Sequence, residues 1–428
     1  MSLKILYLTF YFEPDLCAGS FRNTPLAKEL ARKIGDSGEV HVVTTSPNRY
    51  ISYKQEAPHF EQQGNLFIHR IKIPSHSSGI IDQARSFTTF FRKAIKVTRG
   101  QHFDLVFASS SRLFTAFLGK MISRSQKAPL YLDIRDVFVD TIAEVVQNKI
   151  FRSTGLPFIR LIERYTFSKA NHINLISKGF EPYFTRYKKP HYSCFSNGID
   201  PEFLIDRKGG INEPRLTPGL DQVRFSDGTY EDTTSALISK EFDTKKSNGP
   251  KVKNIVYAGN MGSGQGLEKI IPPLVKALLP RYKFMLIGDG GTKKFLEKAL
   301  QLEGLSDKVV LLPPMNREDL IRMYRSADYL FLHLNDYKAF EKVLPSKIFD
   351  YGAFDVPIIA GVAGFARHFI MDHLPNSIVF EPNNPEDLIL KLKEYNYQLF
   401  HRQEFINNFS RDAINRNMAE SILAYAKV

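Results

Sequence analysis

Short apolar runs alternate with amphipathic stretches along most of the chain. The runs of the first half are KILYL, VHVVTT, LFIHRI, DLVFAS, LYLDI and HINLIS, and those of the second half are NIVYAG, FMLIGDG, VVLLP, YLFLHL, PIIAG and SIVFE. Helical periodicity covers residues 21–34, 266–279, 293–302 and 317–326. Continuous apolar strands that alternate with helices are typical of parallel sheets covered on both faces. Because the pattern restarts in mid-chain, the sequence predicts two doubly wound α/β domains.

An interruption separates the two series of elements. Residues 206–253 are rich in Gly, Pro, Asp, Thr and Lys and show little periodicity, apart from a short predicted helix around residues 235–241. We interpret this stretch as a linker with a partly ordered insertion. The predicted domains are therefore 1–205 and 254–402. Residues 403–428 are expected to form one or two helices that pack back on the N-terminal domain.

Length and composition fit a soluble globular protein. With 428 residues, of which 43% are hydrophobic and 24% charged, two large domains are expected. The longest apolar run, ILYLTFYF, is far shorter than the roughly 20 residues that span a bilayer. Cys17 and Cys194 have neither a disulfide-framework nor a metal-type spacing. Together with the lack of a basic-then-apolar leader, these features predict a cytoplasmic protein with reduced thiols.

The net charge of +13 indicates an anionic partner, such as nucleic acid, an anionic membrane surface or a phosphorylated substrate. Cations gather between residues 81 and 130, where they are interleaved with Phe87, Phe90 and Phe91: Arg85, Arg92, Lys93, Lys96, Arg99, Arg112, Lys120, Arg124 and Lys127. Two interpretations stay open, a core-packed helix with a solvated basic face and a membrane-surface segment. Nucleic acid is disfavoured because an aromatic-basic recognition motif is lacking.

Two strand ends of the first half carry candidate chemistry. Gly19 follows the first strand and precedes a helix, where free N–H groups favour an anion, although a plain turn glycine would look the same. Asp133, Arg135 and Asp136 end and follow LYLDI. They could supply a general base and an electrostatic stabiliser, or they could form a structural Arg–Asp pair.

Two glycine-rich turns follow strands of the second half. The stretch NIVYAGNMGSGQGLEKII carries Gly259, Gly262, Gly264 and Gly266. It is not GxGxxG, so a dinucleotide site is not indicated, but backbone N–H groups could still cradle phosphates. The stretch LIGDGG repeats the layout around Asp289. A tight turn between strand and helix explains this second stretch equally well.

The stretch VLPSKIFDYGAFDVPIIA is the most specific signal. Pro345 and Ser346 predict a helix start, Lys347 follows in the first turn, and Asp350 lies one turn later on the same face. A lysine opposes the helix dipole at this position, whereas an anion there gains about 0.3–1 kcal/mol. We therefore expect Lys347 to bind a phosphate and Asp350 to accept hydrogen bonds from ribose hydroxyls.

Several segments together resemble a known family. In order they are YFEPDLCAGSFR, LDIRD, FSNGID, VYAGNMGSGQGLEKI, LIGDGG, YRSADYLFLHL and VLPSKIFDYGAFDVPIIA. The set resembles the retaining GT-B nucleotide-sugar glycosyltransferases, especially the branch that builds bacterial O-antigen and capsule polysaccharides. The resemblance implies two Rossmann-like domains facing a cleft. The acceptor is expected on the N-terminal domain and the nucleotide sugar on the C-terminal one, with direct transfer and retention of configuration.

The resemblance also assigns individual residues. It places Gly19 near the donor diphosphate and Asp350 at the second acid of a paired-glutamate motif, which holds the ribose. The first acid of that motif falls on Lys342, next to Glu341, and many relatives carry a histidine where this chain has DIRD.

The phosphate-binding arginine and lysine of the family fall on Asn260 and Gln265 in this chain. Neither side chain is cationic. Lys347 is therefore expected to replace the lost charge, and lower activity is an open alternative.

We therefore predict a metal-independent, hexosyltransferase-like enzyme without a cofactor. It would transfer a sugar from a nucleotide diphosphate, with UDP favoured and GDP open, to a polyprenyl-diphosphate-linked saccharide at the inner face of the plasma membrane. The predicted catalytic residues are Asp136, Arg135 and Asp133, and the predicted donor-binding residues are Gly19, Gly262, Asp289, Glu341, Ser346, Lys347 and Asp350. The alternatives are a nonhydrolysing UDP-sugar epimerase, an inactive sugar-nucleotide- or lipid-binding protein, and a nucleic-acid binder.

Overall fold

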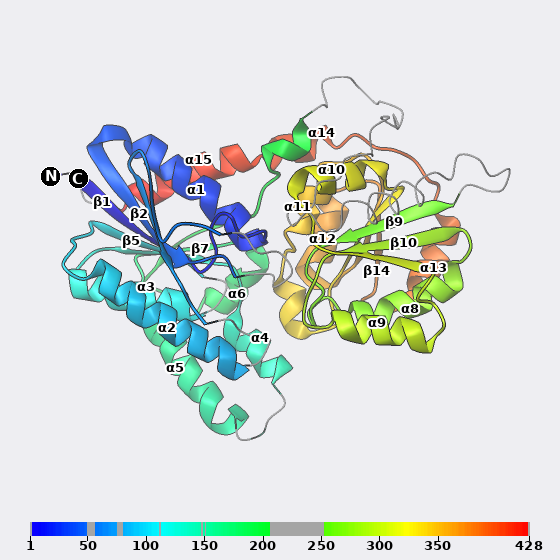
Figure 1. The fold of residues 1–428 in the computed structure, drawn as a ribbon, viewed down its shortest axis with the longest axis horizontal. Helices are drawn as coiled ribbons and strands as arrows, with labels where there is room; N and C mark the ends of the chain where they lie inside the picture. The colour runs from blue at the N-terminus through cyan, green and yellow to red at the C-terminus, as the bar shows by residue number, and fades with distance from the viewer. Residues whose placement is uncertain are drawn as a thin grey trace. The chain divides into compact units, whose positions relative to one another are not determined.

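The structure of the protein is a computed structural model, which describes residues 2–48, 56–74, 80–110, 113–146, 149, 151–205 and 252–426. The predicted linker 206–253 lies outside the described residues except for its last two positions, and so does the helix predicted around residues 235–241. The chain forms two compact units (Figure 1). Unit 1 comprises Met1–Gly198, Tyr337–Ser346 and Phe409–Val428, and unit 2 comprises Ile199–Asp336 and Lys347–Asn408.

Unit 1 contains an eight-stranded sheet in the order β3-β4-β2-β1-β5-β6-β7-β8, in which only the pairing of β3 with β4 is antiparallel. The strands are β1 (Leu3–Leu8), β2 (Gly38–Thr45), β3 (Phe60–Gln63), β4 (Leu66–Ile71), β5 (Leu105–Ser110), β6 (Leu130–Ile134), β7 (His172–Leu175) and β8 (His191–Ser193). The central strands are buried along their whole length, which explains their continuous apolar sequence.

Helices cover both faces of this sheet (Figure 1). They are α1 (Ala18–Ile34), α2 (Ile80–Thr98), α3 (Leu113–Gln126), α4 (Phe138–Val145), α5 (Leu156–Phe167), α6 (Glu181–Phe184) and α15 (Arg411–Leu423), with short turns η1 (Gly35–Ser37), η2 (Phe151–Gly155), η3 (Lys178–Phe180) and η6 (Lys338–Lys342). Ile5 and Tyr7 pack with α1 and α15, whereas Leu6 and Leu8 pack with α2 and α3. Successive side chains of β1 thus serve two separate cores.

Unit 2 contains a six-stranded parallel sheet in the order β11-β10-β9-β12-β13-β14. Its strands are β9 (Lys253–Ala258), β10 (Tyr282–Ile287), β11 (Val309–Leu312), β12 (Tyr329–His333), β13 (Ile358–Gly361) and β14 (Ser377–Phe380). Its helices are α8 (Leu267–Leu278), α9 (Lys293–Leu302), α10 (Arg317–Ser326), α11 (Lys347–Gly352), α12 (Gly364–His373), α13 (Pro385–Glu394) and α14 (Gln403–Asn408), with the turn η4 (Pro201–Leu204). Two doubly wound α/β units confirm the predicted fold class.

Each sheet has a point at which the strand order reverses. In unit 1 the chain adds β2 on one side of β1 and β5 on the other. In unit 2 it adds β10 on one side of β9 and β12 on the other. Ligands bind beyond the carboxyl ends of the strands at such points. The connection from β1 to the first turn of α1, which contains Gly19, and the loop after β9, which contains Gly262, are therefore the positions at which the fold favours a ligand.

The boundaries of the units differ from the predicted ones. Residues 199–205 belong to unit 2, because the Phe203 ring packs on Tyr324 and Phe354. In the C-terminal region α14 belongs to unit 2, where Phe405 stacks on Phe349, and α15 belongs to unit 1. The segment Tyr337–Ser346 also belongs to unit 1, although its neighbours on both sides belong to unit 2.

Candidate functional site

The candidate residues fall into two groups. Unit 2 holds Gly262, Asp289, Lys347 and Asp350, and unit 1 holds Gly19, Asp133, Arg135, Asp136, Glu341 and Ser346. Most of them lie near the carboxyl end of the sheet in their own unit. In parallel α/β sheets this is the edge at which ligands bind.

In unit 2 the two glycine-rich turns touch backbone to backbone. Gly259 and Gly288 have φ angles of 141° and 139°, which side-chain-bearing residues rarely adopt. A Cβ on Gly288 would lie 2.0 Å from the carbonyl oxygen of Gly259. The N–H of Met261 donates to the carbonyl of Asp289 at 2.9 Å, which ties the two turns together. The turn after β9 therefore has a fixed backbone.

The carboxylate of Asp289 stabilises its own turn. Its Oδ1 accepts a hydrogen bond from the N–H of Gly290 at 2.8 Å, and the side chain is half-buried. The carbonyl of Met261 accepts from the N–H of Thr292 at 2.9 Å and from its hydroxyl at 3.0 Å. Asp289 thus has a structural task at this position, and its predicted role in donor binding stays a prediction.

Lys347 lies against the end of β9. It begins α11, and a Cβ on Gly259 would lie 2.2 Å from its Nζ. The ammonium is also 5.1 Å from the centre of the Tyr257 ring. Only a glycine at position 259 leaves room for this arrangement. The structure therefore brings Lys347 to the glycine-rich turn, as its proposed replacement of a phosphate-binding cation requires.

The two neutral residues at the family's cation positions bond to each other. Asn260 Nδ2 donates to Gln265 Oε1 at 2.9 Å, and the N–H of Gly262 donates to the same oxygen at 3.2 Å. The Gln265 side chain thereby closes the turn across Gly262. Two cations approach this turn: Lys347 of α11, which begins some eighty residues later in the sequence, and Lys269 of α8.

Two residues at the end of β12 hold the far side of the turn. Nδ1 of His333 donates to the carbonyl of Gln265 at 2.6 Å, and Nε2 accepts from the N–H of Asn383 at 3.0 Å. Burial lowers the pKa of His333 to about 4, so the ring is neutral with its proton on Nδ1. Asn335 donates to the carbonyl of Ser263 at 3.0 Å. The sequence analysis did not identify His333 or Asn335. Their only signal in the sequence is that polar residues follow the apolar run YLFL.

Tyr351 fixes the direction of α11. Its hydroxyl donates to the carbonyl of Phe331 at 3.1 Å and accepts from the N–H of Ala258 at 3.3 Å. The helix is thus attached to both strands at the reversal point. Asp350 precedes Tyr351 and is half-buried, one turn after Lys347 as predicted.

In unit 1 the structure brings Gly19 and Arg135 together. Gly19 lies in the first turn of α1, and a Cβ there would be 3.1 Å from Arg135 Nη1. The N–H of Arg135 donates to the carbonyl of Ser110 at 3.0 Å, which fixes the residue directly after β6. The first turn of α1 contains no acidic residue. A guanidinium beside an uncapped helix start is suited to an anion.

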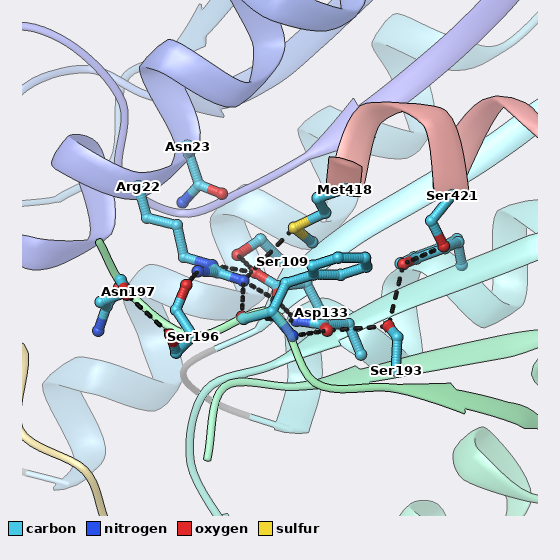
Figure 2. Close-up of polar contacts among 12 residues, drawn as sticks. Arg22, Asn23, Ser109, Asp133, Ser193, Ser196, Asn197, Met418 and Ser421 are labelled. Carbon is cyan, nitrogen blue, oxygen red and sulfur yellow. Dashed lines mark hydrogen bonds and ion pairs between the residues drawn. The ribbon is translucent and has the colours of Figure 1, made fainter. Parts of the chain in front are cut away.

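Asp133 is enclosed in a network of hydrogen bonds, which Figure 2 shows. Arg22 donates to both of its carboxylate oxygens, at 2.8 and 2.9 Å, and neither side chain is more than 2% exposed. Ser109 and Asn174 donate at 2.8 Å each. The pair links α1 to three adjacent strands. Asp133 therefore supports the fold, and the structure favours Asp136 as the candidate for chemistry.

Asp136 has an environment suited to proton transfer. It lies between β6 and α4, half-buried, and accepts a hydrogen bond from the Thr141 hydroxyl at 3.1 Å. Burial raises its pKa to about 6. A carboxyl group with such a pKa exchanges protons near neutral pH, which a general acid or base requires.

Glu341 and Ser346 lie in the segment that the C-terminal half contributes to unit 1. Glu341 is exposed within η6, and Ser346 directly precedes α11. The neighbouring Lys342 forms an ion pair with Asp140 of α4 at 2.6 Å, and its carbonyl accepts from the Ser177 hydroxyl at 2.8 Å. At the family's first acid position this chain thus has a cation with an acid partner inside unit 1.

Comparisons with known proteins match the fold of the chain and a segment of its C-terminal half. Residues 239–412 match the family Glycosyl transferases group 1. An uncharacterized glycosyltransferase of Methanocaldococcus jannaschii is 25% identical over 179 residues, which is 40% of this chain and 42% of that protein. The alignment thus spans about two fifths of the length of that relative.

Solved structures match the whole chain. Sucrose-phosphate synthase from Thermosynechococcus elongatus has a TM-score of 0.62 at 13% identity, with 99% of this chain and 95% of that chain covered. HepE from Anabaena, in complex with UDP and glucose, has a TM-score of 0.64 at 14% identity and coverages of 99% and 100%. The WaaG glycosyltransferase of lipopolysaccharide biosynthesis has a TM-score of 0.57 at 13% identity and coverages of 99% and 95%. These similarities establish the GT-B fold.

Proposed function

We propose that this chain is a glycosyltransferase that takes its sugar from a nucleotide diphosphate bound at the carboxyl end of the unit 2 sheet. The observation that carries the proposal is the Lys347 ammonium beside Gly259, at a turn whose backbone is fixed by Gly288, His333 and Asn335. A cation beside a rigid turn and a helix N-terminus is suited to a diphosphate. The match of residues 239–412 to Glycosyl transferases group 1 supports it.

The chemistry of this arrangement is electrostatic. Breaking the bond between the sugar and the diphosphate leaves negative charge on the phosphate oxygens. A preorganised cation and backbone N–H groups stabilise such charge without further reorganisation. Lys347 and the start of α8 would serve this role, which makes a metal ion unnecessary, and Asp350 would accept hydrogen bonds from ribose. UDP is the favoured nucleotide, because HepE was solved with UDP and with UDP-glucose.

Unit 1 would bind the acceptor. In this proposal Asp136 assists the acceptor hydroxyl, and Arg135 with Gly19 binds an anionic group of the donor or acceptor. Transfer proceeds with retention, and the acceptor is a saccharide on a lipid diphosphate, as in the synthesis of cell-surface polysaccharides. Such an acceptor requires the protein to work as a peripheral protein on the inner face of the plasma membrane.

Calorimetry and product analysis test the proposal. The purified chain should bind UDP and release it from a UDP-sugar in the presence of a lipid-diphosphate saccharide. Nuclear magnetic resonance of the product should show the anomeric configuration of the donor. Failure of both UDP- and GDP-sugars to bind would contradict the proposal. A product with inverted configuration would contradict retention alone.

A catalytically inactive binding protein is a second candidate. The observation that favours it is the bond between Asn260 and Gln265, which replaces two phosphate-binding cations by neutral amides. A chain that binds UDP-sugars but never releases UDP would support this candidate.

A further inference from the structure

Helix α5 exposes large apolar side chains on its outer surface. Its inner face is buried and includes Leu156, Ile159 and Phe167. On the outer face Phe158 is 62% and Leu161 63% exposed. Because the two residues are three positions apart in a helix, they project side by side. Neither of them serves the core of unit 1.

The exposed charged side chains in and just before α5 are all positive. Between residues 151 and 167 the exposed charged residues are Arg152, Arg160 and Arg164. The acid of this stretch, Glu163, is buried and accepts hydrogen bonds from the hydroxyls of Tyr183 and Tyr187, at 2.7 Å each. The outer face of α5 therefore combines protruding apolar groups with exposed arginines, whereas the acid of the helix is buried.

Helix α3 extends this surface. Figure 1 shows α2, α3 and α5 on the same side of the unit 1 sheet, and α3 contacts α5 directly. Met121 of α3 is 40% exposed, and Arg124 donates to the hydroxyl of Tyr165 at 3.1 Å. Burial lowers the pKa of Lys120, and nearby cations, among them Lys169 and Lys189, lower it further. Positive charge is therefore concentrated on this side of the unit.

The aromatic residues of α2 have a different position. Phe90 is completely buried, and Phe87 and Phe91 are packed against the core. The interleaving of aromatic and basic residues in α2 thus reflects a core-packed helix with a solvated basic face, the first of the two interpretations open from the sequence. Among the side chains that the structure describes on this side, the most exposed large apolar ones are Phe158 and Leu161 of α5.

We propose that the outer face of α5, together with Met121 and Arg124 of α3, docks on an anionic lipid bilayer. Phe158 and Leu161 would enter the boundary between headgroups and acyl chains, and the arginines would lie among anionic headgroups. A helix with protruding apolar residues flanked by cations is suited to this interface. The inference rests on the membrane association in the proposed function and assigns it to a surface of unit 1 that contains none of the candidate donor-binding residues of unit 2. None of the described helices is long and apolar enough to cross a membrane.

Vesicle sedimentation of the full chain tests the assignment. The probes are vesicles of phosphatidylcholine alone and of equimolar phosphatidylcholine and phosphatidylglycerol, each at low and high salt. The test variant is the double substitution Phe158→Ser and Leu161→Ser. The control variant is Phe295→Ser and Leu302→Ser in α9 of unit 2, whose side chains are 63% and 78% exposed on a helix with three lysines and one exposed glutamate.

The wild-type chain should bind the anionic vesicles more tightly than the neutral ones, and salt should weaken that binding. The α5 variant should lose affinity by at least about tenfold, whereas the α9 variant should bind like the wild type. UDP binding should be the same in all three proteins. This result would support the assignment.

Equal binding of the α5 variant and the wild type would overturn the assignment and leave membrane association intact. If the wild type did not sediment with vesicles, or sedimented equally with neutral and anionic ones, the assignment and the proposed membrane association would both be wrong. If the wild type did not bind UDP, the glycosyltransferase proposal would be contradicted instead. Single-stranded RNA serves as a second polyanion. If the α5 variant lost RNA binding and kept vesicle binding, the surface would be a nucleic-acid site and the assignment would be wrong.

Discussion

The carboxyl ends of the two sheets differ in how they hold charge. At the end of β6 in unit 1, Asp133 and Arg22 form a completely buried ion pair. At the end of β9 in unit 2, the inner contacts are made by backbone groups, amides and a neutral histidine. The cations beside them are the half-buried Lys347 and the exposed Lys269. In unit 1 the buried Asp133 and Arg22 satisfy each other, whereas in unit 2 cations border a neutral, rigid turn.

This difference separates structural charge from functional charge. Breaking the bonds of a buried carboxylate that has several donors costs much folding free energy, but such a carboxylate has no lone pair left for a substrate. A cation held against glycine backbone at a strand end is instead well placed for a phosphate. Asp136, three residues after Asp133, has the intermediate environment that raises its pKa to about 6. Two acidic residues that lie close together in the sequence can therefore have different roles.

The largest expected effect concerns turnover. Replacing Asp136 by Asn should lower kcat by about 10²–10⁴-fold, because the amide cannot exchange a proton with the acceptor. UDP affinity by calorimetry should stay unchanged, since the donor site lies in unit 2. Normal turnover in a stably folded Asp136→Asn protein would remove Asp136 from the mechanism.

The second effect concerns stability and the residue Asp133, at the end of β6. Asp133→Asn should cost about 3–5 kcal/mol of folding free energy, because Arg22 would stay buried without its counter-ion. Urea denaturation and thermal melting measure this. Glu29→Gln is the matched control, since Glu29 pairs with the exposed Arg32 of α1, and it should cost less than about 1 kcal/mol. Similar losses for the two variants would contradict the contrast between buried and exposed pairs.

The pH dependence of stability distinguishes Asp136 from its neighbour. Its pKa is raised from 3.8 to about 6 in the folded protein. The folded state therefore holds this proton more strongly, and the resulting stabilisation is complete below the unfolded value and is lost as the pH rises through about 6. The total change is no more than about 3 kcal/mol.

Asp136→Asn should remove this component of the pH dependence. The comparison must be wild type against variant, because His172 and His333, each with a pKa lowered to about 4, also titrate. If the difference between the two proteins did not change between pH 4 and pH 7, the raised pKa would be refuted.

The smallest effect concerns the donor. Lys347→Ala should weaken UDP binding by about 1.5–3 kcal/mol, typical of a hydrogen bond to a charged group. Lys276→Ala in α8 is the control, because Lys276 forms an exposed ion pair with Glu303. Calorimetry of both variants with UDP measures the difference. Equal affinities would show that Lys347 does not contact the diphosphate.

Local patterns predicted the elements but not their long-range bonds. Two helices, α9 and α10, have the bounds that periodicity gave them, because their sequences contain both the apolar face and the end signals. The position of Lys347 at the start of α11 was predicted from a few adjacent residues, and its role in phosphate binding, argued from the helix dipole, stays a prediction.

The missed features depend on partners far away in the sequence. His333 bonds to the backbone of Gln265, 68 residues earlier, and such a bond leaves no local pattern. The apolar residues of α2 and α5 look alike in sequence, yet Phe90 is buried and Phe158 is exposed. Only tertiary packing decides which aromatic face meets the core.

The segment Tyr337–Ser346 has a consequence for how this protein could exchange parts with relatives. Unit 1 takes both this segment and α15 from the C-terminal half of the chain. A fragment that ends at residue 205 would therefore lack the Lys342 partner of Asp140, and Met418 and Ile422 would be missing from its core. A chimera that joined residues 1–205 to the C-terminal half of a relative would replace this segment and α15 by the relative's sequences. Stable chimeras should therefore keep this segment and α15 from the same protein as residues 1–205.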